Sequence, residues 1–291
     1  MIDDGRGLSP AFSPMQTTSH RHGLILVAPA LALVCVLFVL PFGLSFFSSL
    51  TNKEGQFTIA NFVRAAELYS TDIAFTIFIV FTSTILIGLV SIVIAGTIIL
   101  SETRWLVIAL GALYRWPLFI PFIVAAQCMR TFLAKNGLMN NSFVALGLAD
   151  PLTTTSFLDW RGIILTFVWK QAPFVTLLLA GAMASLDRAT IEAGRNLGAS
   201  KPRILIELVL PQVRATLTVG LVLSFVTMMS VLSVPLMVAG SQPTMLTVDM
   251  AFRINSYGDY GTANALGVIS YLICGAAAWL YLRHQTREAP R

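Results

Sequence analysis

Charged residues are scarce in this sequence. Asp, Glu, Lys and Arg make up 11% of the 291 residues, whereas hydrophobic residues make up 56% and the mean hydropathy is +0.79. Soluble domains carry about 25% charged residues, so this composition excludes an ordinary soluble enzyme. The hydrophobic residues fall in long runs, which indicates a polytopic membrane protein. The net charge of +5 does not indicate nucleic-acid binding, because the basic residues lie mainly at the ends of the apolar runs.

Groups that carry chemistry are also scarce. The three histidines lie in the terminal tails and the three cysteines lie inside apolar runs, which leaves no disulfide framework and no metal-ligand spacing. A membrane-embedded protease or acyltransferase would need a histidine beside a nucleophile at membrane depth, and the sequence offers none. No G-x-x-x-x-G-K-[ST] loop occurs, so the chain cannot bind ATP phosphates alone. We expect no catalytic, metal or cofactor site here.

The apolar runs predict an all-α membrane domain over residues 24–283, between tails at 1–23 and 284–291. The first tail is expected to be flexible. Prolines at 117 and 121 break the third run, and 138–148 is a candidate surface helix. The six expected transmembrane helices are 24–47, 73–100, one within 112–134, 162–184, 216–239 and 263–282.

Lys and Arg are unevenly distributed over the connections between these spans. Six spans place both termini on one side, and that side carries more Lys and Arg when it also holds residues 187–214. The positive-inside rule therefore predicts cytoplasmic termini. Acidic residues on the other side either face an arriving solute or partner, or merely keep the loops soluble: Glu54, Glu67, Asp72, Asp150, Asp159, Asp249 and Asp259.

The connection between the fourth and fifth spans, residues 187–214, is the longest strongly polar run between two apolar segments. Small residues crowd its first half, and its basic residues are Arg188, Arg195, Lys201, Arg203 and Arg214. Pro202 and Pro211 interrupt helical continuity, which predicts two short helices at the membrane surface with a bend near residues 198–202.

This connection resembles the EAA loop of ABC importer permeases. Glu192-Ala193-Gly194 is followed after three residues by Gly198, and nine residues later by Leu208 and Leu210-Pro211. The family usually has Ala at the position of Gly194 and Ile at that of Leu208. The resemblance covers nearly the whole chain after residue 23 and implies the type I importer permease fold. The alternative is an ordinary basic loop of another membrane protein.

The resemblance implies that residues 187–214, here called the coupling loop, dock into a groove of a cytoplasmic ATPase. Glu192 would contact a basic residue there, Gly198 would allow the bend, and the basic side chains would contact acidic groups. The expected coupling residues are Glu192, Ala193, Gly194, Arg195, Gly198, Ala199, Ser200, Lys201, Arg203 and Pro211.

Partners also follow from the resemblance. It implies an ABC ATPase dimer that binds ATP and Mg, a second permease that is expected to be a homologue, and a periplasmic or lipid-anchored solute-binding protein. This chain would be a non-catalytic transport subunit in the bacterial inner membrane, in contact with lipid and with no nucleic acid. Solute would cross by alternating access, between two permeases.

Polar residues within the spans are candidates for the solute path. Lys170 lies well inside the fourth span, where it either lines the path or binds carbonyls freed by Pro173. Arg115 is expected to reach the membrane surface, and Arg130 lies toward the outer end of the third span. The path candidates are Gln127, Trp169, Lys170, Gln171, Thr176, Ser224, Thr227 and Ser230, each of which could equally be packing polar groups.

Secondary motifs narrow the branch of the family. Residues 196–200 are similar to the branch that handles polyamines, iron, opines and aminoethylphosphonate, and residues 258–263 and 136–140 are similar to spermidine/putrescine permeases. A polyamine or a related small polar solute is therefore expected. The alternatives are a sugar importer, a phosphonate or opine importer, and an ion-coupled secondary carrier that would be indifferent to Glu192. The absence of Asp and Glu from the expected spans disfavours the carrier.

Overall fold

A computed structural model describes residues 20–52, 54–239 and 243–286. The chain divides into two compact units between residues 47 and 48. The predicted all-α fold is confirmed, with one isolated bridge between Thr51 and Phe57 in the described ranges. Five described helices are long and apolar enough to cross a membrane, or six if one sharply bent pair forms a single span. The tail residues 1–19 and 287–291 lie outside the described residues.

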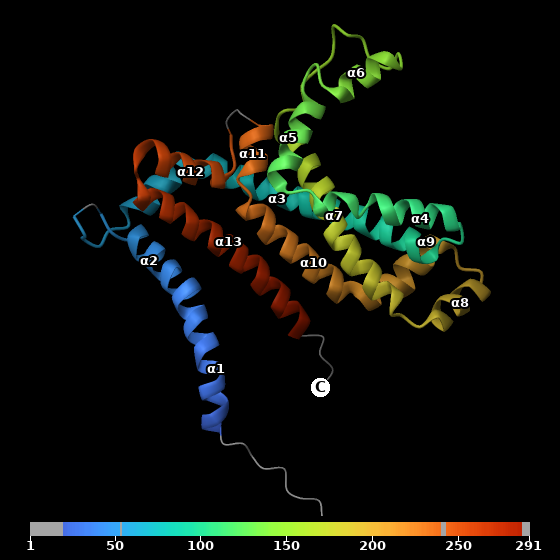
Figure 1. Ribbon diagram of the computed structural model, residues 1–291, viewed down its shortest axis with the longest axis horizontal. Coiled ribbons are helices and arrows are strands. Elements are labelled where there is room, and N and C mark those ends of the chain that lie inside the picture. The colour runs from blue at the N-terminus through green and yellow to red at the C-terminus, as the bar shows by residue number, and fades with distance from the viewer. Residues whose placement is uncertain (1–19, 53, 240–242, 287–291) are drawn as a thin grey trace, which may run out of the picture. The chain divides into compact units, whose positions relative to one another are not determined.

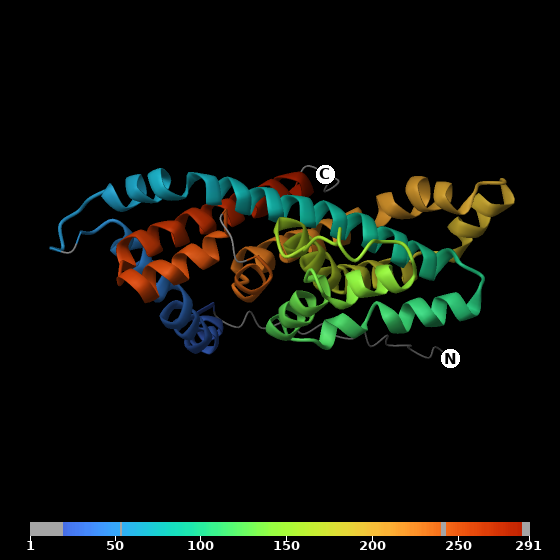
Figure 2. The ribbon, with the colours of Figure 1, turned by 90° about the horizontal axis from the view of Figure 1, so that it is seen from above.

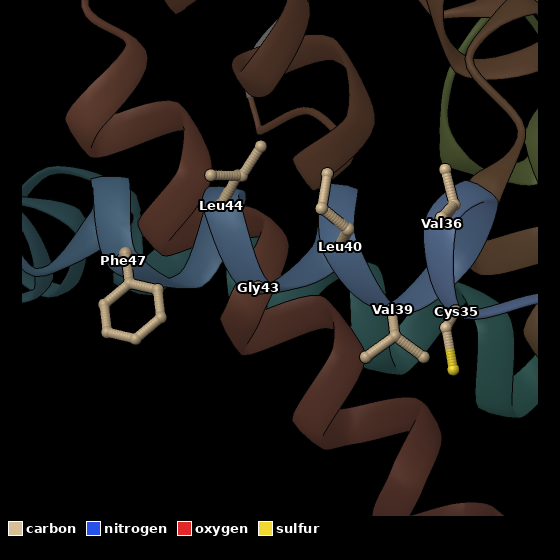
Figure 3. A pocket seen from close by; sticks show the side chains of 7 residues that line it. All are labelled: Cys35, Val36, Val39, Leu40, Gly43, Leu44 and Phe47. Atoms are coloured by element: carbon tan, nitrogen blue, oxygen red, sulfur yellow. The ribbon is translucent and has the colours of Figure 1, made fainter. Parts of the chain in front are cut away.

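The first unit is one apolar rod. It comprises α1 (His20–Val34), the π-helical turn η1 (Cys35–Val39) and the start of α2 (Leu40–Ser49). Helix begins at His20, so the expected tail is shorter than 1–23. Figure 3 shows Val36, Leu40 and Leu44 projecting to one side and Cys35, Val39 and Phe47 to the other. A helix that is apolar all round suits a lipid environment.

The second unit is a helical bundle built on α3 (Ala60–Leu100), which packs against α7, α10 and α13 (Figures 1 and 2). At about 1.5 Å per residue, its 41 residues extend well beyond the roughly 30 Å hydrocarbon core. The helix thus begins 13 residues before the expected span 73–100, because polar residues can continue a helix outside the membrane. The remaining α-helices are α4 (Arg104–Leu113), α5 (Phe122–Leu133), α6 (Leu138–Ala145), α7 (Trp160–Ala184), α8 (Arg188–Asn196), α9 (Lys201–Arg203), α10 (Leu210–Ser230), α11 (Ser233–Val238), α12 (Leu246–Tyr257) and α13 (Tyr260–Thr286).

The third expected span is broken near Pro117 and Pro121, as predicted. Helix α4 is followed by the 3-10 turn η2 (Trp116–Phe119) and then α5, and the helix direction bends by 110° at this break. Pro117 and Pro121 lack the amide hydrogens that a continuous helix needs, which explains the break. The predicted surface helix is confirmed as α6, at residues 138–145.

The fifth expected span is shifted toward the N-terminus. Helix α10 ends at Ser230, and α11 forms a separate helix where residues 231–239 had been expected to continue the span. The helix of the sixth expected span, α13, continues to Thr286, so part of the expected C-terminal tail is helical. Helix α12 fills the connection that was expected to be merely polar.

Three apolar clusters run along the second unit. The central one joins α3, α5, α7, α10 and α11 around Ile79, Phe167 and Met228. A second, around Leu100, Leu179 and Ile204, supports the coupling-loop end. A third joins α3 to α12 and α13 at the other end. Figure 1 shows α8 and α12 at opposite ends of this bundle.

Candidate coupling site and solute path

Helix α8 forms the first half of the coupling loop, and both of its ends are closed by the sequence. Asp187 accepts a hydrogen bond from the amide of Ala189 at 2.9 Å, as an N-cap does. At the other end the amide of Gly198 donates to the carbonyl of Arg195, and that of Ala199 donates to Gly194. This pair of bonds is a Schellman ending, and it requires the positive φ of +79° that Gly198 adopts. The predicted bend is confirmed at that residue.

The second half of the coupling loop is not the separate short helix that was expected. Helix α9 continues through the π-helical turn η3 (Ile204–Val209) into α10, so one rod runs from Lys201 to Ser230. Pro211 does not break it, because the preceding residue, Leu210, already bonds five residues back, to the carbonyl of Leu205. The same arrangement precedes Pro41, where Leu40 bonds to Cys35. In both places a wide turn absorbs the missing proline amide.

The two departures from the family pattern lie against each other. A Cβ atom placed on Gly194 would lie 2.8 Å from Cδ1 of Leu208 and 3.4 Å from Cγ1 of Ile204. Gly194 is buried at this contact. The longer reach of Leu208 therefore fills the space that an alanine methyl group would occupy.

The charged residues of the coupling loop partly pair within the chain. One oxygen of Glu102, in the connection between α3 and α4, lies 3.4 Å from Nη1 of Arg195 and 3.5 Å from Nζ of Lys201. Arg195 also donates from Nη2 to the carbonyl of Leu100 at 3.2 Å. Arg203 instead pairs with Glu207 at 2.9 Å, one turn along the same rod. Contact of these basic side chains with acidic groups of an ATPase remains a prediction, and the structure adds partners within the chain.

Glu192 lies on the exposed side of α8, beside a cavity of about 950 Å³ between α8 and the α3–α4 connection. Its polar lining comes from Ser101, Glu102, Arg104, Arg188, Glu192 and Arg195. The other coupling candidates, Ala193, Gly198, Ser200 and Pro211, are exposed, and Ala199 is half-buried. The site thus presents a charged surface with a recess beside it.

Lys170 lies deep within α7 and binds the broken span. Its Nζ donates to the carbonyls of Pro117 at 2.9 Å and Leu118 at 3.3 Å, and lies 5.1 Å from the ring centre of Phe122. Carbonyl binding was one of the two expected roles, but the carbonyls are those of η2 and not those freed by Pro173. The buried ammonium group thereby gains hydrogen-bond acceptors, and the carbonyls at the helix break gain a donor.

The eight path candidates do not form one surface. Four are buried within this chain: Lys170, Gln171, Thr176 and Ser224. Gln127 and Ser230 are exposed, whereas Trp169 and Thr227 are half-buried. The three α10 residues at 224, 227 and 230 therefore differ in exposure, from buried Ser224 to exposed Ser230. Arg130 is exposed, and Arg115 is exposed with its Nε donating to the hydroxyl of Tyr114 at 3.1 Å.

Acidic residues at the α12 end have structural partners that sequence reasoning missed. Asp72 accepts from the amide of Thr244 at 2.8 Å, and Asp72 and Asp249 are buried rather than facing outward. Asp259 lies 3.7 Å from Arg64 and 3.5 Å from Arg253. No local signal in the sequence reveals the pairings of Asp72 with Thr244 and of Asp259 with Arg64, because these partners lie far apart in the chain. Asp72 lies within α3, one residue before the expected span 73–100.

Comparison with known proteins agrees with this geometry. The family described as binding-protein-dependent transport system inner membrane component matches residues 62–287. A crystal structure of a bacterial ABC transporter involved in the import of the acidic polysaccharide alginate has a chain that superposes with a TM-score of 0.77 at 19% identity, over 93% of this chain and 98% of that one.

Curated relatives come from several transport systems. The sulfoquinovosyl glycerol permease SmoG of Agrobacterium fabrum is 27% identical, over 89% of both chains. The trehalose/maltose permease MalF of Thermococcus litoralis is 25% identical, over 93% of this chain and 96% of its own. The spermidine/putrescine permease PotB of Escherichia coli is 22% identical over 57% of this chain and 62% of its own. The match over most of the described membrane domain shows that this chain belongs to the family of ABC importer permeases, the inner membrane components of binding-protein-dependent transport systems.

Proposed function

We propose that this permease subunit carries a sugar or a sugar-containing compound. The observation that carries this proposal is coverage: two sugar-system relatives match nearly end to end, whereas the polyamine relative matches a little over half of this chain. Sugar transport, first considered as the alternative, therefore replaces the polyamine expectation, which is not confirmed.

The proposed coupling mechanism centres on α8. Its capped ends hold a short helix that packs on the second apolar cluster through Ile191, and Glu192 is exposed. A partner ATPase that hydrolyses ATP would bind this exposed side, with Glu192 facing a basic residue. This role places the α8 end of the bundle in the cytoplasm and the α12 end outside, toward a solute-binding protein.

The proposed path uses the exposed polar residues rather than the buried ones. A path between two permeases must be lined by side chains that a single chain leaves accessible. Gln127 and Ser230 meet this condition, and Trp169 and Thr227 meet it in part. Gln171, Thr176 and Ser224 lie inside the core instead, where they contribute to helix packing. The second permease is proposed to be a homologous chain.

Reconstitution tests the proposal. The chain would be assembled in proteoliposomes with its partner ATPase, second permease and binding protein. Solute-dependent ATP hydrolysis and uptake of sugars, sulfonated glycosides and polyamines would then be measured. Sugar-dependent uptake supports the solute class, and uptake of polyamines alone would overturn it.

A matched pair of variants tests the coupling role. Glu192→Ala should abolish solute-stimulated ATP hydrolysis while the chain still inserts in the membrane. Thr190→Ala, an exposed residue of the same helix, should leave transport unchanged. Unchanged transport in Glu192→Ala, or transport driven by an ion gradient without ATP, would refute the proposed coupling.

A further inference from the structure

A single carboxylate lies between the two arms of the coupling loop. Glu102 is in the three-residue connection between α3 and α4, and its Oε1 lies within 3.5 Å of both Arg195 and Lys201. Arg195 is in the last turn of α8, whereas Lys201 is the first residue of α9. Gly198, the residue of the bend, lies between them. Glu102 therefore contacts the coupling loop on both sides of its bend.

Arg195 adds a second contact to the same connection. Its other terminal nitrogen donates to the carbonyl of Leu100, the last residue of α3. Carbonyls at a helix C-terminus have no partner within the helix and carry partial negative charge, so a guanidinium group is favoured there. Arg195 thus binds both the end of α3 and the carboxylate that follows it.

We infer that Glu102 is a positioning residue for coupling: it fixes the bend of the coupling loop to the end of α3. This inference rests on the proposed coupling role of α8. Helix α3 packs against α7, α10 and α13, and α7 holds the broken span through Lys170. A displacement of α8 would reach the core through Glu102 and α3, in addition to the direct chain connection through α9 and α10.

The strength of the contact suits this role. The side chains of Glu102, Arg195 and Lys201 are 70%, 38% and 51% exposed, and exposed ion pairs contribute little to stability. Removal of the carboxylate should therefore leave the fold intact. A weak contact can also break and re-form within a transport cycle, which a buried pair cannot do readily.

The test measures solute transported per ATP hydrolysed in proteoliposomes that hold the complete transporter. Glu102→Gln should lower this ratio several-fold, while ATPase binding, measured by co-purification, stays unchanged. Glu207→Gln is the matched control, since it removes an exposed carboxylate of the same segment that pairs with Arg203 and not with α3. It should leave the ratio unchanged.

A charge exchange separates positioning from a general loss of negative charge. Glu102→Arg combined with Arg195→Glu restores the pair with reversed polarity, and should recover part of the ratio lost in Glu102→Arg alone. A normal ratio in Glu102→Gln, or no recovery on exchange, overturns the inference. If Glu102→Gln is normal and Glu192→Ala is uncoupled, the inference fails while the proposed function stands. If both variants transport normally, the coupling role itself fails.

Discussion

Replacement of Lys170 tests whether this residue supports the broken span or lines the solute path. Lys170→Met keeps much of the side-chain volume but removes the ammonium group. The carbonyl of Pro117 keeps a partner, because the amide of Ile120 donates to it at 3.3 Å. The carbonyl of Leu118 loses the lysine contact. The contact to the ring of Phe122 is also lost.

The expected destabilisation follows from these changes. A hydrogen bond from a charged group contributes about 1.5–3 kcal/mol, and an unpartnered buried carbonyl costs about 1–3 kcal/mol. Relief from burying a charge, at 7% exposure, offsets part of this loss. We expect a net loss of about 1–3 kcal/mol, with Lys170→Arg less affected because it keeps a charged donor.

Thermal unfolding of the purified chain, followed by loss of the monodisperse peak on size-exclusion chromatography, measures this effect. Lys170→Met should unfold several degrees lower than the parent, and the exposed control Lys135→Met should not. Equal stability of Lys170→Met and the parent, together with a raised KM for solute, would refute the structural role. That result would assign Lys170 to the path.

Three further predictions concern local geometry and charge. Gly194→Ala and Leu208→Ile should each be near neutral or destabilising by about 1 kcal/mol. Because the two side chains share one space, the double variant should be more stable, by about 0.5–1 kcal/mol, than the sum of the two single effects predicts. A double-mutant cycle measured by thermal unfolding would show this coupling. Gly198→Ala should destabilise α8 by about 1–2 kcal/mol in the same assay and weaken ATPase binding, since φ is +79° there. Burial and the charge of Asp72 raise the pKa of Asp249 to about 7, against the opposing charge of Arg253. The free energy of unfolding should therefore fall by at most about 4 kcal/mol as the pH rises from 3.8 to about 7, and Asp249→Asn should remove this pH dependence.

Long apolar runs made the helical membrane fold predictable, because lipid requires every backbone polar group to be paired within the helix. The position of α8 and the bend at Gly198 were also predictable, since capping and φ preferences act over a few residues. Helix ends outside the membrane were not, because polar sequence neither requires nor forbids helix there. Residues 60–72 of α3 are the clearest example.

The wrong predictions mostly concern proline and tertiary pairing. Pro211 predicted the end of a helix, but a π-helical turn that ends just before it lets the helix continue without the proline amide. No local sequence pattern predicts that such a turn will form. Likewise, nothing in the sequence distinguishes Glu102 from an ordinary loop residue. Its partners on the coupling loop follow from how α3 and α8 pack, which periodicity cannot reveal.

The unbroken rod from Lys201 to Ser230 has a mechanical consequence. Thirty residues of helix measure about 45 Å, so one end acts on the other as a rigid lever. In the proposed coupling role, a tilt of about 5° at the α9 end would move the far tip through roughly 4 Å. A modest motion of a partner bound at that end would thereby be magnified without any change of helix length, and the amplification would be set by the continuity of one polypeptide segment.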